Sequence, residues 1–316
     1  MNKAEAFSKE ILFLNIAQVI HKQDDAPTKL AAAFEKSFTR MLSTEYIDYA
    51  GKAVKSALGV FKRRPRNVGT ATAITRAVSR AMLPYGGDVA PEIRKQVATF
   101  YGAASAQFTG SLRVAKATIE PTVGFTLSLR DKKAIEAIQK LSVQTAGTYF
   151  PTQVEGKVAQ VVEAVVLNDG LSTADAAVRL QAELEGALGL EASAAIPTQF
   201  ATNPQFYFQI LAENASVQAT SISRLSSMSD AGVEKFRVEA IIDKRTSNIC
   251  TELNGREFSV GGAVKAIDAF ISAESIVDVQ KILPFNNKDE VPKWADSGIG
   301  FPPYHLKCRS TVVPVF

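Results

Sequence analysis

The side chains of this chain that are best suited to chemistry lie close to its C-terminus. Both of its cysteines, Cys250 and Cys308, are there, together with His305, one of its two histidines. Thiolate and imidazole groups bind zinc, and a thiolate beside an imidazole is also a nucleophile. This concentration predicts that two runs, residues 241–250 and 301–316, meet in the folded protein.

Three interpretations of the two runs are open from the sequence. Zinc would be held by Cys250, His305 and Cys308, with a water or the carboxylate of Asp243 as fourth ligand. Alternatively, a Cys–His nucleophile pair with Asp243 as its orienting group would make an enzyme. We favour the third, a buried cluster in which Cys250 lies near Cys308 and His305 donates a hydrogen bond.

The charged and hydroxyl residues of the two runs also point to structural roles. Arg309 is the predicted partner of Asp243, since arginine pairs well with a carboxylate. Arg245 lies two residues after Asp243, and Thr246 is predicted to close the turn after a strand. The sequence holds no phosphate-binding glycine loop and no HExxH motif. We therefore expect no catalytic residues.

Positive charge is concentrated in one part of the chain. Residues 51–133 hold 15 Lys and Arg against 4 Asp and Glu, a net charge of +11 in a chain whose total is +4. The densest run comprises Lys62, Arg63, Arg64 and Arg66. Such a run is either a solvated loop between helices or a contact for the nucleic-acid backbone, which cations bind without reading sequence.

Apolar spacing predicts a mainly α fold, with helical N-terminal and middle regions and a small C-terminal α/β (α+β) module. Helices are expected at 2–22, 28–61, 67–83 and 88–119, with breaks at 84–87 and 147–151. Ser172 is the predicted N-cap of a later helix.

The expected C-terminal module contains a strand within 233–242 and a helix at 263–273. A hairpin turn is predicted at Asn254-Gly255, and an edge strand at 310–316.

These patterns divide the chain into three consecutive regions. Residues 1–130 form a helical region that is basic from residue 51, residues 131–232 a second helical region, and residues 233–316 the small α+β module. His21 is interpreted as a residue at the end of the first helix. No segment has the length and apolarity of a membrane span or the features of a signal peptide, so we expect a protein that is made in the cytosol.

The order of the C-terminal motifs resembles that of a known family. Asp243-Lys-Arg245-Thr246, then Cys250 and Gly255, then His305-Leu-Lys-Cys308-Arg309 is similar to the signature of the Mu F-like phage minor head proteins, also called head morphogenesis proteins. The similarity covers roughly residues 133–316. Ser247 and Ser310 stand where some members of that family have cysteine, so the expected four-cysteine zinc site is depleted here.

The resemblance implies a structural virion protein of a tailed bacteriophage. Such a protein would be bound in few copies near the portal, inside the capsid, after assembly in the host cytoplasm. It would act in head morphogenesis and in DNA packaging or ejection. The portal protein, other head proteins and packaged double-stranded DNA are the implied partners, and no cofactor is required. The alternative is a metal- or thiol-dependent enzyme, such as a nuclease or toxin-like effector carried in the virion.

Overall fold

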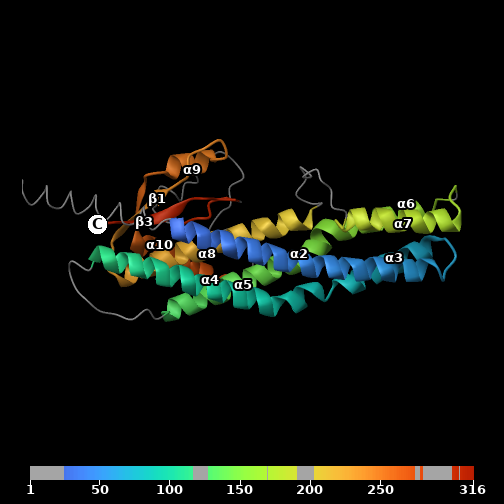
Figure 1. Ribbon diagram of the computed structural model, residues 1–316, viewed down its shortest axis with the longest axis horizontal. Coiled ribbons are helices and arrows are strands. Elements are labelled where there is room, and N and C mark those ends of the chain that lie inside the picture. The colour runs from blue at the N-terminus through green and yellow to red at the C-terminus, as the bar shows by residue number, and fades with distance from the viewer. Residues whose placement is uncertain are drawn as a thin grey trace, which may run out of the picture. The chain divides into compact units, whose positions relative to one another are not determined.

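The computed structural model describes residues 25–116, 127–168, 170–190, 203–274, 278–279, 301–305 and 307–316. The predicted helix 2–22 and His21 lie outside these residues. The described part is mainly helical and carries a small C-terminal sheet, which confirms the predicted fold class (Figure 1). The elements are α2 (Asp25–Phe61), α3 (Val68–Met82), α4 (Tyr85–Lys116), α5 (Leu129–Tyr149), the π-helical segment η1 (Phe150–Val154), α6 (Glu155–Val166), α7 (Thr173–Ala187), α8 (Pro204–Asp230), β1 (Lys235–Glu239), α9 (Asn248–Leu253), β2 (Glu257–Ser259), α10 (Val260–Ile271) and β3 (Thr311–Val315).

The chain forms two compact units that are each built from separated stretches of sequence. The first takes in the chain up to Glu35 together with Lys95–Leu141 and Glu213–Phe316, and the second takes in Lys36–Arg94 and Ser142–Ala212. The divisions therefore fall within α2, α4, α5 and α8. These units differ from the three consecutive regions inferred from the sequence. A long amphipathic helix gives no signal in the sequence where it passes from one unit to the next.

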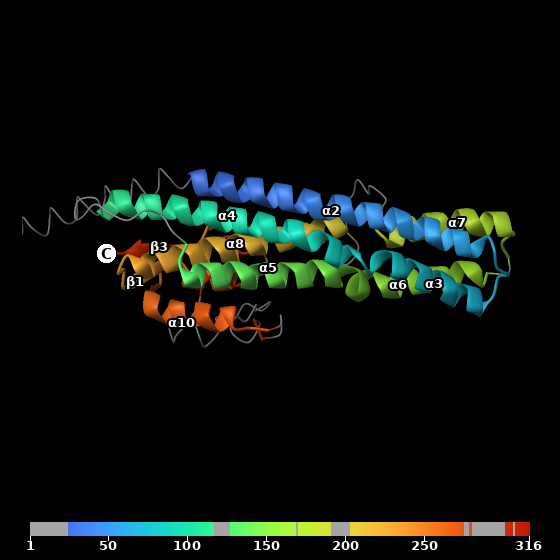
Figure 2. The ribbon, with the colours of Figure 1, turned by 90° about the horizontal axis from the view of Figure 1, so that it is seen from below.

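The second unit is held together by aromatic packing between four helices. Tyr46 of α2 packs edge-on against Tyr85 of α4, Tyr149 of α5 and Phe208 of α8, with ring centroids 5.2–5.8 Å apart. The Tyr85 hydroxyl donates to the carbonyl of Leu42 at 3.0 Å, which satisfies its buried polar group. Beyond this cluster α6 packs between α3 and α7, and Figure 2 shows α3 and α6 side by side.

Of the two predicted helix breaks, the one at 84–87 is confined to Leu83 and Pro84, between α3 and α4, and the one at 147–151 is continuous helix. Gly86 and Gly87 lie in the first turn of α4, and the chain passes from α5 through η1 into α6 across residues 147–151. The reason is packing between helices. A Cβ atom on Gly86 would lie only 2.7 Å from the Cα of Gly147. Glycine is therefore needed at position 86 for the close approach of α4 and α5.

The first unit contains the C-terminal sheet, whose strand order is β2-β1-β3 with antiparallel pairing throughout. The predicted edge strand at the end of the chain is confirmed as β3, and the predicted C-terminal helix as α10. Helix α8 is tied to β3 by the buried Arg224, which donates to Thr311 Oγ1 at 2.6 Å and to the carbonyl of Val312 at 3.2 Å. The guanidinium of Arg224 also lies 5.2 Å from the ring centroid of Phe108 on α4.

The hairpin turn predicted at Asn254-Gly255 is wrong. A two-residue hairpin of this kind requires positive φ at both residues, but φ is −60° at Asn254 and +80° at Gly255. Helix α9 separates β1 from β2, and the two residues join α9 to β2. The Asn254 side chain accepts a hydrogen bond from the backbone of Ala240, and Gly255 donates to the carbonyl of Val238.

Candidate functional site: a Cys–His–Cys cluster at the end of the small sheet

The turn that follows β1 is closed by its own side chains. Thr246 Oγ1 accepts the backbone N–H of Asp243 and donates to the carbonyl of Ile241, both at 2.7 Å. Asp243 in turn accepts the backbone N–H of Arg245 at 2.8 Å. Thr246 therefore closes the turn after the strand, as the sequence predicts.

Asp243 is also paired with Arg309 from the other motif run. Arg309 donates two hydrogen bonds to the Asp243 carboxylate, at 2.8 and 2.6 Å, in a bidentate arrangement. The bonds from Arg309, followed by the backbone bond from Arg245, hold the pKa of Asp243 well below its usual range. The predicted partnership is confirmed. The Arg245 side chain is exposed, and its guanidinium lies 3.8 Å from the same carboxylate.

Helix α9 carries Cys250 into the interior of the module. Ser247 is the N-cap of α9 and accepts the backbone N–H of Cys250 at 3.3 Å. Cys250 is buried together with Ile249 and Leu253. The three apolar side chains fix one face of this short helix against the core.

The second motif run supplies His305 and Cys308 from a tight turn before β3. The backbone N–H of Cys308 donates to the carbonyl of His305 at 3.2 Å, and Lys307 between them adopts φ +61°. Phe301, Tyr304 and Cys308 are buried, which anchors the turn on both sides. His305 is half-buried.

These segments bring the three predicted side chains together. Cys250 Sγ lies 3.0 Å from His305 Nε2 and 3.8 Å from Cys308 Sγ, and the hydroxyl of Ser310 donates to Cys250 Sγ at 3.1 Å. The three atoms Cys250 Sγ, His305 Nε2 and Cys308 Sγ all lie within 4.8 Å of one another. The two runs therefore meet, as predicted.

The cluster concentrates negative charge on one sulfur. Hydrogen bonding from the Cys308 thiol, and then from His305, Ser247 and Ser310, lowers the pKa of Cys250 to about 4. The same contact with Cys250, together with burial, raises the pKa of Cys308 well above its usual value. A thiolate at Cys250 surrounded by donors is the form of this cluster that satisfies its buried polar atoms.

The geometry bears on two roles of Asp243 that the sequence left open. Both oxygens of Asp243 are bound by Arg309. Asp243 is therefore already paired, which disfavours it as the orienting group of a Cys–His pair and as a metal ligand.

The basic run divides into residues with different environments. Lys62, Arg63 and Arg64 are exposed just after α2 ends. Arg66 instead binds the backbone at the end of α6 and in the loop that follows it, donating to the carbonyls of Val166 at 3.2 Å, Leu171 at 2.5 Å, Val165 at 3.3 Å and Asn168. Its expected role as a phosphate contact is replaced by this structural one, because four carbonyl acceptors occupy its guanidinium.

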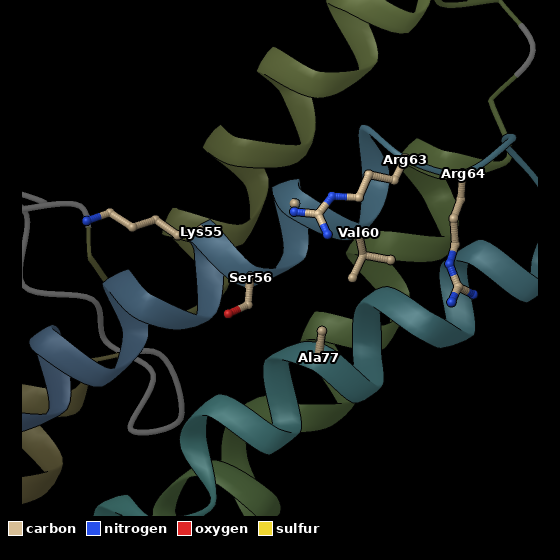
Figure 3. A pocket seen from close by; sticks show the side chains of 7 residues that line it. Lys55, Ser56, Val60, Arg63, Arg64 and Ala77 are labelled. Carbon is tan, nitrogen blue, oxygen red and sulfur yellow. The ribbon is translucent and has the colours of Figure 1, made fainter.

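Figure 3 shows a surface groove beside this run, at the C-terminal end of α2. The groove has a volume of about 530 Å³ and is lined by Lys55, Ser56, Gly59, Val60, Arg63, Arg64 and Ala77. Lys55 was missed by the sequence reasoning. It lies on α2, which leads directly into the run, about two helical turns before Arg63, and this proximity would have indicated it.

Within the described residues, no helix combines the length and the apolarity that a bilayer crossing needs. No model of a known protein family matches the chain, and neither a curated protein nor a solved structure matches it.

Proposed function

We propose that this chain is a structural minor head protein of a tailed bacteriophage. In this proposal it resides inside the capsid near the portal vertex after assembly in the host cytoplasm. It binds the portal protein and other head proteins and assists head morphogenesis and the packaging or ejection of DNA. The resemblance of its C-terminal motifs to those of the Mu F-like family is the basis of the proposal.

One structural observation supports the proposal. The motif residues bind one another across the two runs: Asp243 pairs with Arg309, and Cys250 contacts both His305 and Cys308. Side chains that bind one another in this way stabilise the small C-terminal module. This pattern fits an assembly protein better than an enzyme, which would direct such side chains at a substrate.

The first experiment locates the protein. Particles of the phage that encodes the chain are purified, treated with nuclease and quantified by mass spectrometry, with the major capsid protein as the internal standard. The expected result is a few copies of the chain per particle, retained after nuclease treatment. If the chain is abundant in the lysate but missing from particles, the proposal is wrong.

The groove at the end of α2 supports a contact with packaged DNA. Lys55, Arg63 and Arg64 present cations on an exposed surface, where binding to phosphates needs no base recognition. Each phosphate contact lowers the slope of log K against log salt by about 0.9 for duplex DNA. The double variant Arg63→Ala/Arg64→Ala is therefore expected to reduce the magnitude of this slope by about 1.8.

A matched control is available on α5. Lys132 and Lys133 are also adjacent and exposed, so Lys132→Ala/Lys133→Ala removes the same charge elsewhere. Binding of the full chain to a duplex of arbitrary sequence is measured at several salt concentrations. An equal change in slope for both double variants would assign the effect to net charge and contradict a specific DNA-contacting surface.

A second candidate function is favoured by one distance. Cys250 Sγ and His305 Nε2 are 3.0 Å apart, which is within the reach required of a nucleophile and its base. The corresponding function is a thiol- or metal-dependent hydrolase, such as a nuclease or toxin-like effector. Turnover of DNA or protein substrates by the full chain that disappears in Cys250→Ser but persists in Ser37→Ala, at an exposed position of α2 outside the groove, would favour this candidate over the first.

A further inference from the structure

The Cys250–His305–Cys308 cluster has the dimensions of a zinc site. Two Zn–S bonds of about 2.3 Å at a tetrahedral angle separate the sulfurs by about 3.8 Å. The observed distance between Cys250 Sγ and Cys308 Sγ is 3.8 Å. The sulfurs are therefore already spaced for a shared ion.

The histidine needs only a small adjustment. With Zn–S of about 2.3 Å and Zn–N of about 2.0 Å, tetrahedral geometry separates sulfur and nitrogen by about 3.5 Å. His305 Nε2 lies 3.0 Å from Cys250 Sγ. An outward movement of the half-buried imidazole by about half an ångström opens the centre of the triangle to a metal.

The backbone is also arranged to present two ligands together. Lys307 adopts the left-handed φ of +61°, which is uncommon for a residue with a side chain. This turn allows the N–H of Cys308 to bond the carbonyl of His305. The side chains of His305 and Cys308 then both lie within 4.8 Å of Cys250 Sγ, which comes from α9.

The fourth position has an identifiable neighbour. Asp243, which the sequence offered as a fourth ligand, is bound by Arg309. The buried hydroxyl of Ser310 lies 3.1 Å from Cys250 Sγ and is thus beside the position that remains. Serine is not among the side chains that ordinarily bind zinc, so a water beside Ser310 would be the fourth ligand.

From these contacts we infer that Cys250, His305 and Cys308 bind one zinc ion, with Ser310 beside its fourth coordination position. The bound ion would link α9 to the turn before β3 as a structural cross-link. The inference concerns the small module alone and does not depend on the proposed role in the virion. A zinc-binding chain that is missing from particles would uphold the inference and defeat the proposed function.

The test uses the full chain, purified under reducing conditions without chelator. Elemental analysis is expected to find close to one zinc per chain, and Cys308→Ser is expected to hold less than a tenth of that. Replacement of zinc by Co²⁺ is expected to give the intense visible bands of a tetrahedral cobalt centre and a thiolate charge-transfer band in the near ultraviolet. Both features should weaken in Cys308→Ser.

A variant that adds a ligand keeps the test decisive if Cys308→Ser fails to fold. Ser310→Cys places a third thiolate beside Cys250 and is expected to tighten zinc binding at least tenfold in a chelator competition. Ser56→Cys adds a thiol in the other compact unit and is expected to leave the affinity unchanged.

Two results would overturn the inference. The first is a reduced, folded wild-type chain that binds no zinc or cobalt above the level of Cys308→Ser, with Ser310→Cys no tighter. The second is a chain isolated from the reducing cytosol with Cys250 and Cys308 joined in a disulfide, detected as the loss of two hydrogens from the intact mass.

Discussion

The close approach of two helices at Gly86 and Gly147 allows one prediction to be worked out in magnitude. A methyl group at position 86 would lie 2.7 Å from the Cα of Gly147, whereas a methyl group at position 87 would have no heavy atom within 4 Å. Both glycines lie in the first turn of α4. Replacing either by alanine gains up to about 1 kcal/mol from helix propensity. Only Gly86→Ala adds an overpacking penalty, of about 1–3 kcal/mol.

The difference between the two variants therefore isolates the steric effect. Gly87→Ala is expected to be at least as stable as the wild type, and Gly86→Ala to be about 1–3 kcal/mol less stable than Gly87→Ala. Urea denaturation followed by circular dichroism measures both. Gly147→Ala should be milder, because its Cβ would lie 3.4 Å from the Cα of Gly86. Equal stability of Gly86→Ala and Gly87→Ala would refute the close helix contact.

Three further predictions concern side chains that bind at a distance in sequence or cap a helix. Arg309 keeps the folded-state pKa of Asp243 below its unfolded value, so the pair stabilises the module at neutral pH and loses this effect only as pH falls below about 4. Asp243→Asn should therefore lower the free energy of unfolding at pH 7, as measured by urea denaturation. The difference from the wild type should shrink as the pH is lowered. Arg66→Ala should lower the free energy of unfolding by about 1–3 kcal/mol, since it leaves carbonyls at and after the end of α6 without their donor, and should leave DNA affinity unchanged. Arg64→Ala should instead lower DNA affinity and leave the free energy of unfolding unchanged. Ser172→Ala should cost about 1 kcal/mol, as measured by thermal denaturation, because the backbone N–H of Asp175 loses its acceptor, and Ser172→Thr should restore the stability because it keeps the hydroxyl.

Local features of the sequence predicted the structure well where a residue acts on its near neighbours. Ser172 is the N-cap of α7, as its position before the helix indicated. The β-branched residues at the end of the chain form β3, with Pro314 tolerated in an edge strand. The contact between Asp243 and Arg309 was also predictable, because the resemblance placed both residues in one module and their charges are complementary.

Two contacts between segments that are far apart in sequence were not predictable. Gly86-Gly87 has the composition of a turn, yet Gly86 faces Gly147, which is far away in sequence. Arg66 belongs to a basic run that suggests phosphate binding, but the end of α6 provides carbonyl acceptors for it. In both cases the local pattern indicated what kind of contact the residue is able to make. The partner was set by the fold, which brings together segments that are far apart in sequence.

The candidate site shows the same division. The residue types of Cys250, His305 and Cys308 indicated what they are able to bind, and their motif order indicated that they meet. Their separations and the occupation of Asp243 by Arg309 came only from the fold. The spacing of the two sulfurs suits a shared metal ion, and the pairing of Asp243 with Arg309 disfavours its carboxylate as a ligand.

Pro314 has a consequence for how copies of this protein are able to associate. It lies opposite Phe236 in the pairing of β3 with β1, and β3 forms one edge of the sheet. Proline has no backbone N–H, and the carbonyl of Val312 on the same strand is already bonded by the buried Arg224, so β3 cannot offer an unbroken row of backbone groups to an incoming strand. Strand exchange and fibre-like stacking are disfavoured at this edge even at the high protein concentrations of a crowded compartment.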